Sequence, residues 1–241
     1  MDSRRAARGR RAVRDRTREL RGRYRARRTR TARDTPFLNP PGGCMTLATT
    51  PTILIVPGLR DHVEDHWQTH LERRLPNARS VAPLEADKLS RAARVAALDA
   101  ALAEIDGPVI LVAHSAGVMI TVHWALQATR EIHSALLAAP ADLDTPMPAG
   151  YPTPEAFDAL GWTPVPTARL QFPSLVAASR NDPLARFERV EALAAGWGSK
   201  LVDLGEVGHL NPASGYGEWH DAERLIGEVV ALGESRSDLI D

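Results

Sequence analysis

The sequence predicts an α/β fold with a doubly wound, mainly parallel sheet. Short runs rich in Val, Ile and Leu alternate along the chain with longer stretches whose apolar residues recur at helical spacing. Near-continuous apolar strands are typical of parallel sheets, because helices cover both faces of such sheets. The chain has 241 residues, which is enough for one domain of this class with a sizeable core. Its single cysteine excludes an intrachain disulfide.

The elements follow one another regularly from residue 52. The first expected strand is the run Thr-Ile-Leu-Ile-Val, which ends at a Pro-Gly pair. In the second expected helix, Val95, Leu98 and Leu102 share one face with Ile105. The expected strands lie at 52–56, 79–82, 109–113, 134–140, 173–179 and 201–204. The expected helices lie at 65–75, 90–105, 118–127, 184–195 and 222–232.

Three parts of the chain are expected: an Arg-rich extension over 1–47, a folded domain over 48–235 and a tail over 236–241. Residues 1–44 contain 15 arginines against four acidic residues and have little apolar content. This segment cannot bury enough apolar surface to fold, so we expect it to be disordered. Three interpretations stay open: a start assigned too far upstream of a true start at Met45, a basic arm that binds nucleic acid or an anionic surface, or a targeting peptide.

The rest of the chain has the opposite charge. The whole chain is formally neutral and its first 44 residues carry about +11, so the remainder carries about −11. An acidic domain binds nucleic acid poorly, so nucleic acid is expected as a partner only if the Arg-rich segment is a genuine basic arm of the protein. No apolar run approaches the roughly 20 residues of a membrane-spanning helix, and no apolar signal core follows the arginines. We expect a cytoplasmic protein.

Residues 141–172 interrupt the alternation of strands and helices. They contain six prolines and carry Tyr151, Phe157 and Trp162. Loops of this length in a compact domain are often functional. An active-site cap, a small lid and a long surface excursion are all open interpretations.

The most informative segment is Val-Ile-Leu-Val-Ala-His-Ser-Ala-Gly at 109–117. An apolar strand runs into Ser115, small residues flank this serine at Ala113 and Gly117, and a helical stretch follows. Strand, sharp turn and helix form a nucleophile elbow, in which the serine adopts a positive φ and large neighbours would clash. Ala113 replaces the usual glycine but is still small. We expect His114 to pack or hydrogen-bond beneath the turn.

A nucleophilic serine needs a base and a third group that orients the base. Asp182 follows the expected strand at 173–179, and His209 follows the strand at 201–204. The chain order Ser115, Asp182, His209 is that of doubly wound hydrolases, whose catalytic loops lie at the carboxyl ends of strands. These three residues are the candidate catalytic set. The alternatives are that Asp182 only caps a helix and that His209 is a structural histidine.

Catalysis at Ser115 also requires two backbone N–H groups aimed at the developing negative charge, which form the oxyanion hole. Ala116, next to the nucleophile, is expected to supply one of them. Leu59, in the loop after the first strand, is expected to supply the other, and Gly58 would let this loop approach the substrate. The alternative is that the Pro-Gly pair merely turns the chain.

Three histidines, His62, His66 and His70, recur every four residues. On a helix they would lie on one face, as metal ligands can. However, Glu64 is in the wrong place for the His-Glu-x-x-His zinc motif, and the first of these residues precedes the expected helix. We therefore expect neither a metal site nor a cofactor.

Several motifs occur together in a recognisable order. They are Val-Pro-Gly at 56–58, His-Trp-Gln at 66–68, Ala-His-Ser-Ala-Gly at 113–117, Ser-Arg-Asn-Asp-Pro at 179–183, Gly-His-Leu-Asn at 208–211 and Gly-Tyr-Gly-Glu-Trp at 215–219. With these motifs, residues 50–233 resemble the small serine hydrolases of the retinoblastoma-binding protein nine and YdeN group. The resemblance implies a compact α/β-hydrolase fold with minimal or no lid, and a Ser-Asp-His triad at Ser115, Asp182 and His209. It also places His66, Trp67 and Trp219 near the pocket, with Trp67 as a substrate-binding residue.

The resemblance further implies esterase or aminopeptidase-like activity. The Leu-x-Cys-x-Glu motif of the vertebrate member is absent, because the body of this chain has no cysteine, so that member's tumour-suppressor partner is not implied. We predict a serine hydrolase that cleaves a small ester, or an amide or thioester, through an acyl intermediate on Ser115. The expected partner is a small-molecule ester or a peptide-like substrate. Nothing in the sequence indicates the leaving group or the oligomeric state.

A second hypothesis assigns the chain to a different class. It is a non-catalytic binding or regulatory protein on a hydrolase scaffold, since a fold does not dictate a function. The intact set of Ser115, Asp182 and His209 argues against it, because a pure binding protein could lose any of these side chains without penalty.

Overall fold

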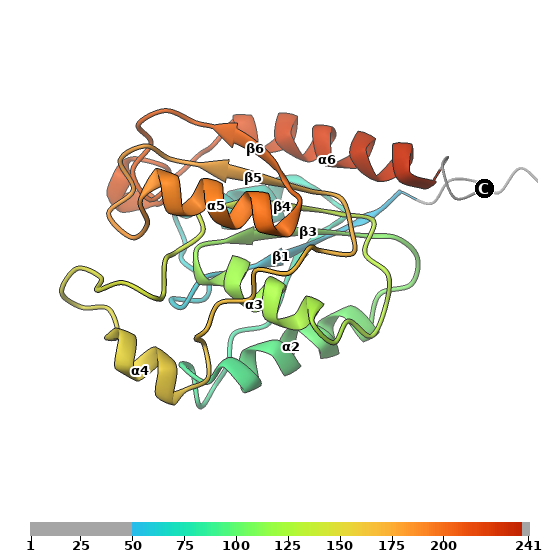
Figure 1. Cartoon of the computed structure of the whole chain (residues 1–241). Coiled ribbons are helices and arrows are strands. Elements are labelled where there is room, and N and C mark those ends of the chain that lie inside the picture. The colour runs from blue at the N-terminus through green and yellow to red at the C-terminus, as the bar shows by residue number, and fades with distance from the viewer. Residues whose placement is uncertain (1–49, 238–241) are drawn as a thin grey trace, which may run out of the picture. The chain divides into compact units, whose positions relative to one another are not determined.

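The computed structural model describes residues 50–237, and the Arg-rich segment over 1–47 lies outside them. In the described part, six strands form one parallel sheet in the order β2-β1-β3-β4-β5-β6 (Figure 1). The strands are β1 (Thr52–Val56), β2 (Ala78–Ser80), β3 (Val109–His114), β4 (Ser134–Ala138), β5 (Ser174–Ala178) and β6 (Lys200–Asp203). The predicted doubly wound, parallel sheet is confirmed.

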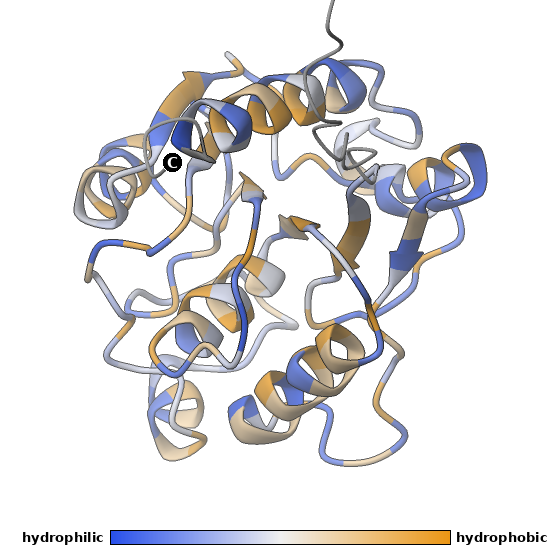
Figure 2. Ribbon diagram, turned by 90° about the vertical axis from the view of Figure 1, so that its right-hand side faces the viewer, coloured by the Kyte–Doolittle hydropathy of each residue, from blue (hydrophilic) through white to orange (hydrophobic). Residues whose placement is uncertain are grey.

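The helices are α1 (Trp67–Arg74), α2 (Arg91–Ala103), α3 (Ala116–Ala125), α4 (Pro154–Ala159), α5 (Phe187–Trp197) and α6 (Asp221–Ser237). One apolar cluster joins α1 and α6 to one face of the sheet, and a second joins α2, α3 and α5 to the other. Ile53 and Ile55 of β1 lie in the first cluster, whereas Leu54 and Val56 lie in the second, because successive strand side chains point to opposite faces. Figure 2 accordingly shows strands that are largely hydrophobic and helices of mixed character. No helix within residues 50–237 combines the length and the apolar character that a membrane span requires.

The helix ends follow local capping chemistry. The Ser90 side chain accepts a hydrogen bond from the Ala93 N–H at the start of α2 (3.2 Å). At the start of α1, Nδ1 of His66 accepts one from the Gln68 N–H (3.2 Å), so this helix begins two residues later than predicted. The last helix, α6, continues to Ser237 and so includes the first two residues of the expected tail.

Helix α5 begins at Phe187, three residues later than predicted. The preceding turn uses the Asp182 carboxylate, which accepts the N–H of Leu184 (2.8 Å). Asp182 is therefore not the cap of this helix, because the N-cap position belongs to Arg186. The helix ends at Gly198, whose φ of 69° is a left-handed conformation that glycine adopts without strain.

The Pro-rich excursion at 141–172 has two different halves. Its second half is packed into the core: Phe157 and Trp162 are buried, and the Trp162 Nε1–H donates to the Leu89 carbonyl (2.8 Å). The short helix α4 lies in this half and is capped by Thr153. The first half runs along the carboxyl edge of the sheet, where Met147 and Tyr151 line a pocket.

The strand register brings separate loops to that edge. Val56, the last residue of β1, pairs with Ala113, and His114 at the end of β3 pairs with Ala138 at the end of β4. The loops that follow these strands therefore leave the sheet side by side. In open parallel sheets this carboxyl edge is where ligands bind.

Candidate active site

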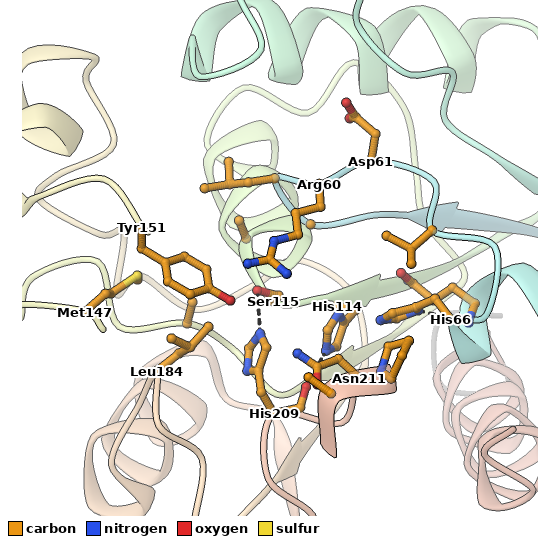
Figure 3. Close-up of a pocket in the computed structure, with 18 of the residues that line it drawn as sticks. Arg60, Asp61, His66, His114, Ser115, Met147, Tyr151, Leu184, His209 and Asn211 are labelled. Atoms are coloured by element: carbon orange, nitrogen blue, oxygen red, sulfur yellow. Dashed lines mark hydrogen bonds between the residues drawn. The ribbon is translucent and has the colours of Figure 1, made fainter. Parts of the chain in front are cut away.

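Ser115 occupies a strained turn between β3 and α3. Its φ of 58° and ψ of −127° are rare for a residue with a side chain, and its N–H donates to the Ala138 carbonyl (3.1 Å). Glycine is required nearby, because a Cβ on Gly117 would lie 2.1 Å from the Val56 carbonyl oxygen. The turn thus lifts the serine side chain out of the sheet edge and into the pocket (Figure 3).

A row of hydrogen bonds joins three side chains from three loops. Nε2 of His209 lies 2.8 Å from Oγ of Ser115, and Nδ1 of His209 lies 2.8 Å and 3.0 Å from the two carboxylate oxygens of Asp182. An ionised carboxylate only accepts hydrogen bonds, so Nδ1 carries the imidazole proton. Nε2 is then free to accept the Ser115 hydroxyl. The side chains of His209 and Asp182 are 5% and 3% exposed, so little solvent competes for their bond.

The loop that carries His209 is held from several sides. Gly208 has a φ of 59°, and its N–H donates to the Asn181 side chain (2.6 Å). The N–H of His209 donates to the Ser214 hydroxyl (3.1 Å), which is itself bonded to Asn211 (3.1 Å). The sequence motifs at 179–183 and 208–211 therefore do more than supply Asp182 and His209, because Gly208 and Asn181, which precede these two residues, bind one another.

Two further histidines stand behind His209. His114 is buried, and its Nε2–H donates to the backbone carbonyl of His209 (2.9 Å), as expected for a residue that hydrogen-bonds beneath the turn. The His66 and His114 rings are 4.7 Å apart between centroids, and the His114 and His209 rings are 4.9 Å apart. These three imidazoles form a continuous row of tilted rings along one side of the pocket, with interplanar angles of 54° and 46°.

Burial keeps the two rear histidines uncharged at neutral pH. It is the main reason that the pKa of His114 lies well below its usual value, and the nearby charges of His209 and His66 act in the same direction. Burial likewise lowers the pKa of His66 to about 4, with smaller contributions from His209 and His70. At neutral pH, a positive charge on His209 would therefore face neutral rings and the Asp182 carboxylate.

The loop after β1 is tied to Arg94, a residue of α2 that is only 5% exposed. The Arg94 guanidinium donates to the Leu59 carbonyl (3.0 Å), contacts the Gly58 carbonyl (3.5 Å) and pairs with the Asp61 carboxylate (2.7 Å). The Gly58 carbonyl also accepts the Asp61 N–H (3.1 Å). A trans peptide unit is planar with its C=O and N–H on opposite sides, so this arrangement turns the Leu59 N–H away from Arg94.

The N–H groups of Leu59 and Ala116 have no protein acceptor among the residues that the structure describes. Both residues line the same pocket as Ser115. Gly58 lies against the nucleophile, since a Cβ at this position would be 3.2 Å from Cβ of Ser115. The structure thus brings Gly58, Leu59, Ala116 and Ser115 together in one pocket.

The pocket beside Ser115 has a volume of about 140 Å³. This is room for several waters or for a small organic group. Its wall is largely apolar, with one arginine at its mouth, Arg60. The apolar wall residues are Leu59, Val63, Ala141, Leu143, Met147 and Leu184.

Trp67 does not line this pocket. Its side chain is 1% exposed and packs edge-on against Trp219, with ring centroids 4.9 Å apart. The neighbouring His66 lies at the pocket wall instead. Trp67 begins α1 and its side chain lies in the core, so the structure gives this residue a packing role in place of the expected role in substrate binding. In residues 50–237, no three His, Cys, Asp or Glu side chains gather as metal ligands would.

Arg94 is not among the site residues predicted from the sequence. A signal for it exists, because Arg94 lies four residues before Leu98, on the apolar face of α2. An arginine on a buried face needs partners, and the carbonyl groups of the loop after β1 supply them.

Comparisons with known proteins agree with this architecture. A family model described as serine hydrolase matches residues 53–228. A structure described as a putative YdeN-like hydrolase, from Pectobacterium atrosepticum, is 33% identical and has a TM-score of 0.62, covering 76% of this chain and 90% of that one. The ydeN gene product of B. subtilis is 17% identical with a TM-score of 0.59, covering 76% of this chain and all of the other (100%).

A more distant likeness extends the comparison of folds. Est1E from Butyrivibrio proteoclasticus is 14% identical, has a TM-score of 0.55 and covers 81% of this chain and 90% of that one. At this level of identity the likeness concerns the fold alone. Among curated proteins, no sequence matches this chain.

Proposed function

The chain belongs to the serine hydrolase family, in the group of YdeN-like hydrolases with an α/β-hydrolase fold, and we propose that it cleaves a small ester through an acyl intermediate on Ser115. The observation that carries this proposal is the row from Ser115 through His209 to Asp182, with two hydrogen bonds of 2.8 Å. The row opens into the small apolar pocket, where an acyl group of matching size can bind.

In the first half of the reaction, Oγ of Ser115 attacks the carbonyl carbon of the ester. Nε2 of His209 accepts the hydroxyl proton as the new C–O bond forms. The N–H groups of Leu59 and Ala116 form the oxyanion hole for the tetrahedral intermediate. This intermediate collapses to the acyl-serine, and His209 returns the proton to the departing alcohol.

In the second half, a water replaces the alcohol. His209 takes a proton from this water, whose oxygen attacks the acyl carbon and forms a second tetrahedral intermediate in the same oxyanion hole. Collapse releases the carboxylic acid and returns the proton to Oγ of Ser115. Asp182 holds the imidazole in the correct tautomer and stabilises its charged form in both halves. An amide or thioester in the same position would follow the same steps with an amine or thiol as leaving group.

The test of the proposal is the reactivity of Ser115. The purified wild-type protein, Ser115→Ala and Ser235→Ala are treated with a fluorophosphonate probe, with a heat-denatured sample beside them. Ser235 is the matched control, because it is an exposed serine on α6 whose hydroxyl donates to the Ala231 carbonyl. We expect labelling of the wild type and of Ser235→Ala only. The Ser115→Ala change should lower turnover of p-nitrophenyl butyrate by at least about 10³-fold.

Failure of a folded wild-type protein to label would contradict the proposal and would favour the binding or regulatory protein. Full esterase activity in Ser115→Ala would remove Ser115 from the reaction. Labelling of the heat-denatured protein would show that the probe reacts without an activated nucleophile.

A further inference from the structure

Arg60 places a positive charge at the mouth of the pocket. It follows Leu59 in the loop after β1, is exposed to solvent and lines the same cavity as Ser115. Its guanidinium carbon lies 5.3 Å from the centroid of the Tyr151 ring, a distance at which the ring face attracts a cation. Figure 3 shows the guanidinium pointing into the cavity above Ser115, beside that ring.

No carboxylate within residues 50–237 neutralises this cation. The adjacent carboxylate, Asp61, pairs with Arg94 (2.7 Å) and Lys88 (3.7 Å), and Figure 3 shows it pointing away from the cavity. Asp182 is bonded to His209. Arg60 is therefore held over the cavity by an aromatic ring and has no counter-charge of its own in this part of the chain.

Arg180 provides a contrast on the same molecule. It also lies over an aromatic ring, 4.8 Å from the centroid of Phe187, and it forms an ion pair with Asp203 (2.6 Å) outside the pocket. An arginine stacked in this way can therefore have a protein carboxylate as a partner. Among residues 50–237, no carboxylate occupies the corresponding place beside the Arg60 guanidinium at the pocket mouth.

The surroundings of Arg60 favour an anion with an apolar body. The planar guanidinium offers parallel N–H groups that match a carboxylate in a bidentate pair. The cavity beneath it is lined by Leu143, Met147 and Leu184. Apolar walls reduce the competition from water, which strengthens a charge pair at the mouth.

From this geometry we infer that the substrate carries a carboxylate on a short apolar chain, and that Arg60 binds this carboxylate while the ester lies at Ser115. The inference rests on the proposed function, whose site it uses. Arg60 is then a specificity-determining residue, and Tyr151 positions its guanidinium.

Two matched pairs of esters test the inference. In the first pair, mono(p-nitrophenyl) adipate and its methyl ester differ only in a carboxylate at the end of the acyl chain. In the second, 4-butanoyloxybenzoate and its methyl ester differ only in a carboxylate on the leaving group. The readout is the ratio of kcat/KM for the anionic ester to kcat/KM for the neutral ester within each pair.

We expect the wild type to prefer the anionic member of one pair by about tenfold, as for a charge-assisted bidentate contact that is partly open to solvent. Arg60→Gln should abolish this preference. Arg60→Lys should retain part of it, because lysine keeps the positive charge but cannot form the bidentate pair. Arg73→Gln is the matched control: this arginine of α1 is 55% exposed, and its loss changes the net charge equally without touching the pocket. High salt should weaken the preference in the wild type and leave Arg60→Gln unaffected.

Three results would overturn the inference: no preference for the anion in either pair, an unchanged ratio in Arg60→Gln, or an equal loss in Arg73→Gln. Failure of the proposed function would look different, because then neither esters nor the fluorophosphonate probe would react. In that case, calorimetric titration of the wild type and Arg60→Gln with monomethyl adipate tests whether Arg60 binds an anion. Binding that is equal in the two proteins, or absent from both, would rule out an anion site at Arg60.

Discussion

The pocket has two walls that are built in different ways. One wall, here called the strand-end wall, consists of the loops after β1, β3, β5 and β6 at residues 58–61, 114–116, 182–184 and 208–211. Its polar groups are bonded repeatedly to buried partners: Arg94 ties the first of these loops, and His114 ties the last. Each reacting atom is therefore placed by hydrogen bonds that exist before a substrate arrives.

The second wall, here called the excursion wall, consists of residues 141–151. Asp142 anchors its beginning through an N–H bond to the Leu184 carbonyl (2.9 Å) and a contact with Arg189. Farther along, among residues 146–151, the one backbone hydrogen bond in the described structure runs from the Tyr151 N–H to the Pro148 carbonyl (3.3 Å). Met147 and Tyr151 meet the cavity by apolar and aromatic contact.

The difference separates two requirements of catalysis. Stabilising charge in a transition state demands dipoles and donors that do not reorganise, which the strand-end wall supplies. Accommodating an acyl chain demands only apolar surface of suitable shape, which tolerates small adjustments. Changes in the strand-end wall should therefore alter kcat for every ester, and changes in the excursion wall should alter which ester is preferred.

Outside the row of Ser115, His209 and Asp182, the largest effect is expected from Arg94→Gln. This change removes the guanidinium that contacts the Gly58 carbonyl and so helps to orient the peptide group that carries the Leu59 N–H. Loss of one oxyanion-hole donor typically costs about 10²-fold or more in turnover. We expect kcat for p-nitrophenyl butyrate to fall by about a hundredfold with little change in KM. Arg94→Lys should recover part of the loss, since it keeps the charge beside Asp61.

A matched variant separates positioning from general destabilisation. Arg130 also donates to the backbone carbonyls of a turn, at Leu102 and Gly107, but it lies outside this pocket. Arg130→Gln should lower the free energy of unfolding without a comparable fall in kcat. If both variants lose activity only in proportion to the folded fraction, or if Arg94→Gln raises KM and leaves kcat unchanged, Arg94 does not position the oxyanion hole.

A second prediction concerns the acid sensitivity of the strand-end wall. The pKa of His66 is lowered to about 4 in the folded state, below its ordinary value of 6.5. The unfolded chain therefore binds a proton at this residue first, so stability falls as the pH drops from about 6.5 toward about 4. At pH 5 this one group should cost about 2 kcal/mol of the free energy of unfolding.

His66→Asn tests that assignment, because asparagine keeps a good helix N-cap and does not titrate. Urea unfolding at pH 7.5 and pH 5.0 gives the loss of stability on acidification for each protein. The loss should be about 2 kcal/mol smaller in the variant than in the wild type, whatever the stability of the variant at pH 7.5. Equal losses in the two proteins would mean that His66 protonates alike in the folded and unfolded states.

Some residues of the strand-end wall can be predicted from the sequence and others cannot. Ser115, Asp182 and His209 could be predicted because each lies in a short motif directly after an apolar strand, and parallel strands bring such positions to one edge. The role of Arg94 could not be assigned from local pattern, because its partners in the loop after β1 lie 33 to 36 residues away in the chain. Trp67 was misassigned for a related reason: its neighbour in sequence faces the pocket, and only the packing against Trp219 shows which of the two is in the core.

The smallest effect is expected from Met147→Ala in the excursion wall. Met147 is half-buried and borders the cavity, so its truncation enlarges the space for the acyl chain. The ratio of kcat/KM for p-nitrophenyl octanoate to that for the butanoate should rise by about threefold, the scale of one or two methylenes in an apolar pocket. The free energy of unfolding should change by less than about 1 kcal/mol, since a partly exposed site loses little packing.

Leu184→Ala is the matched change on the strand-end wall. Leu184 lines the same cavity but is 4% exposed and follows Asp182 closely, so its truncation should cost about 2–5 kcal/mol of stability. It should also lower kcat for all esters alike, because the loop that orients His209 loses its packing. Should Met147→Ala instead depress every ester equally, or destabilise the fold as much as Leu184→Ala does, the excursion wall would be as rigid as its counterpart. The two walls would then share one role, and chain-length preference would have to come from the strand ends themselves.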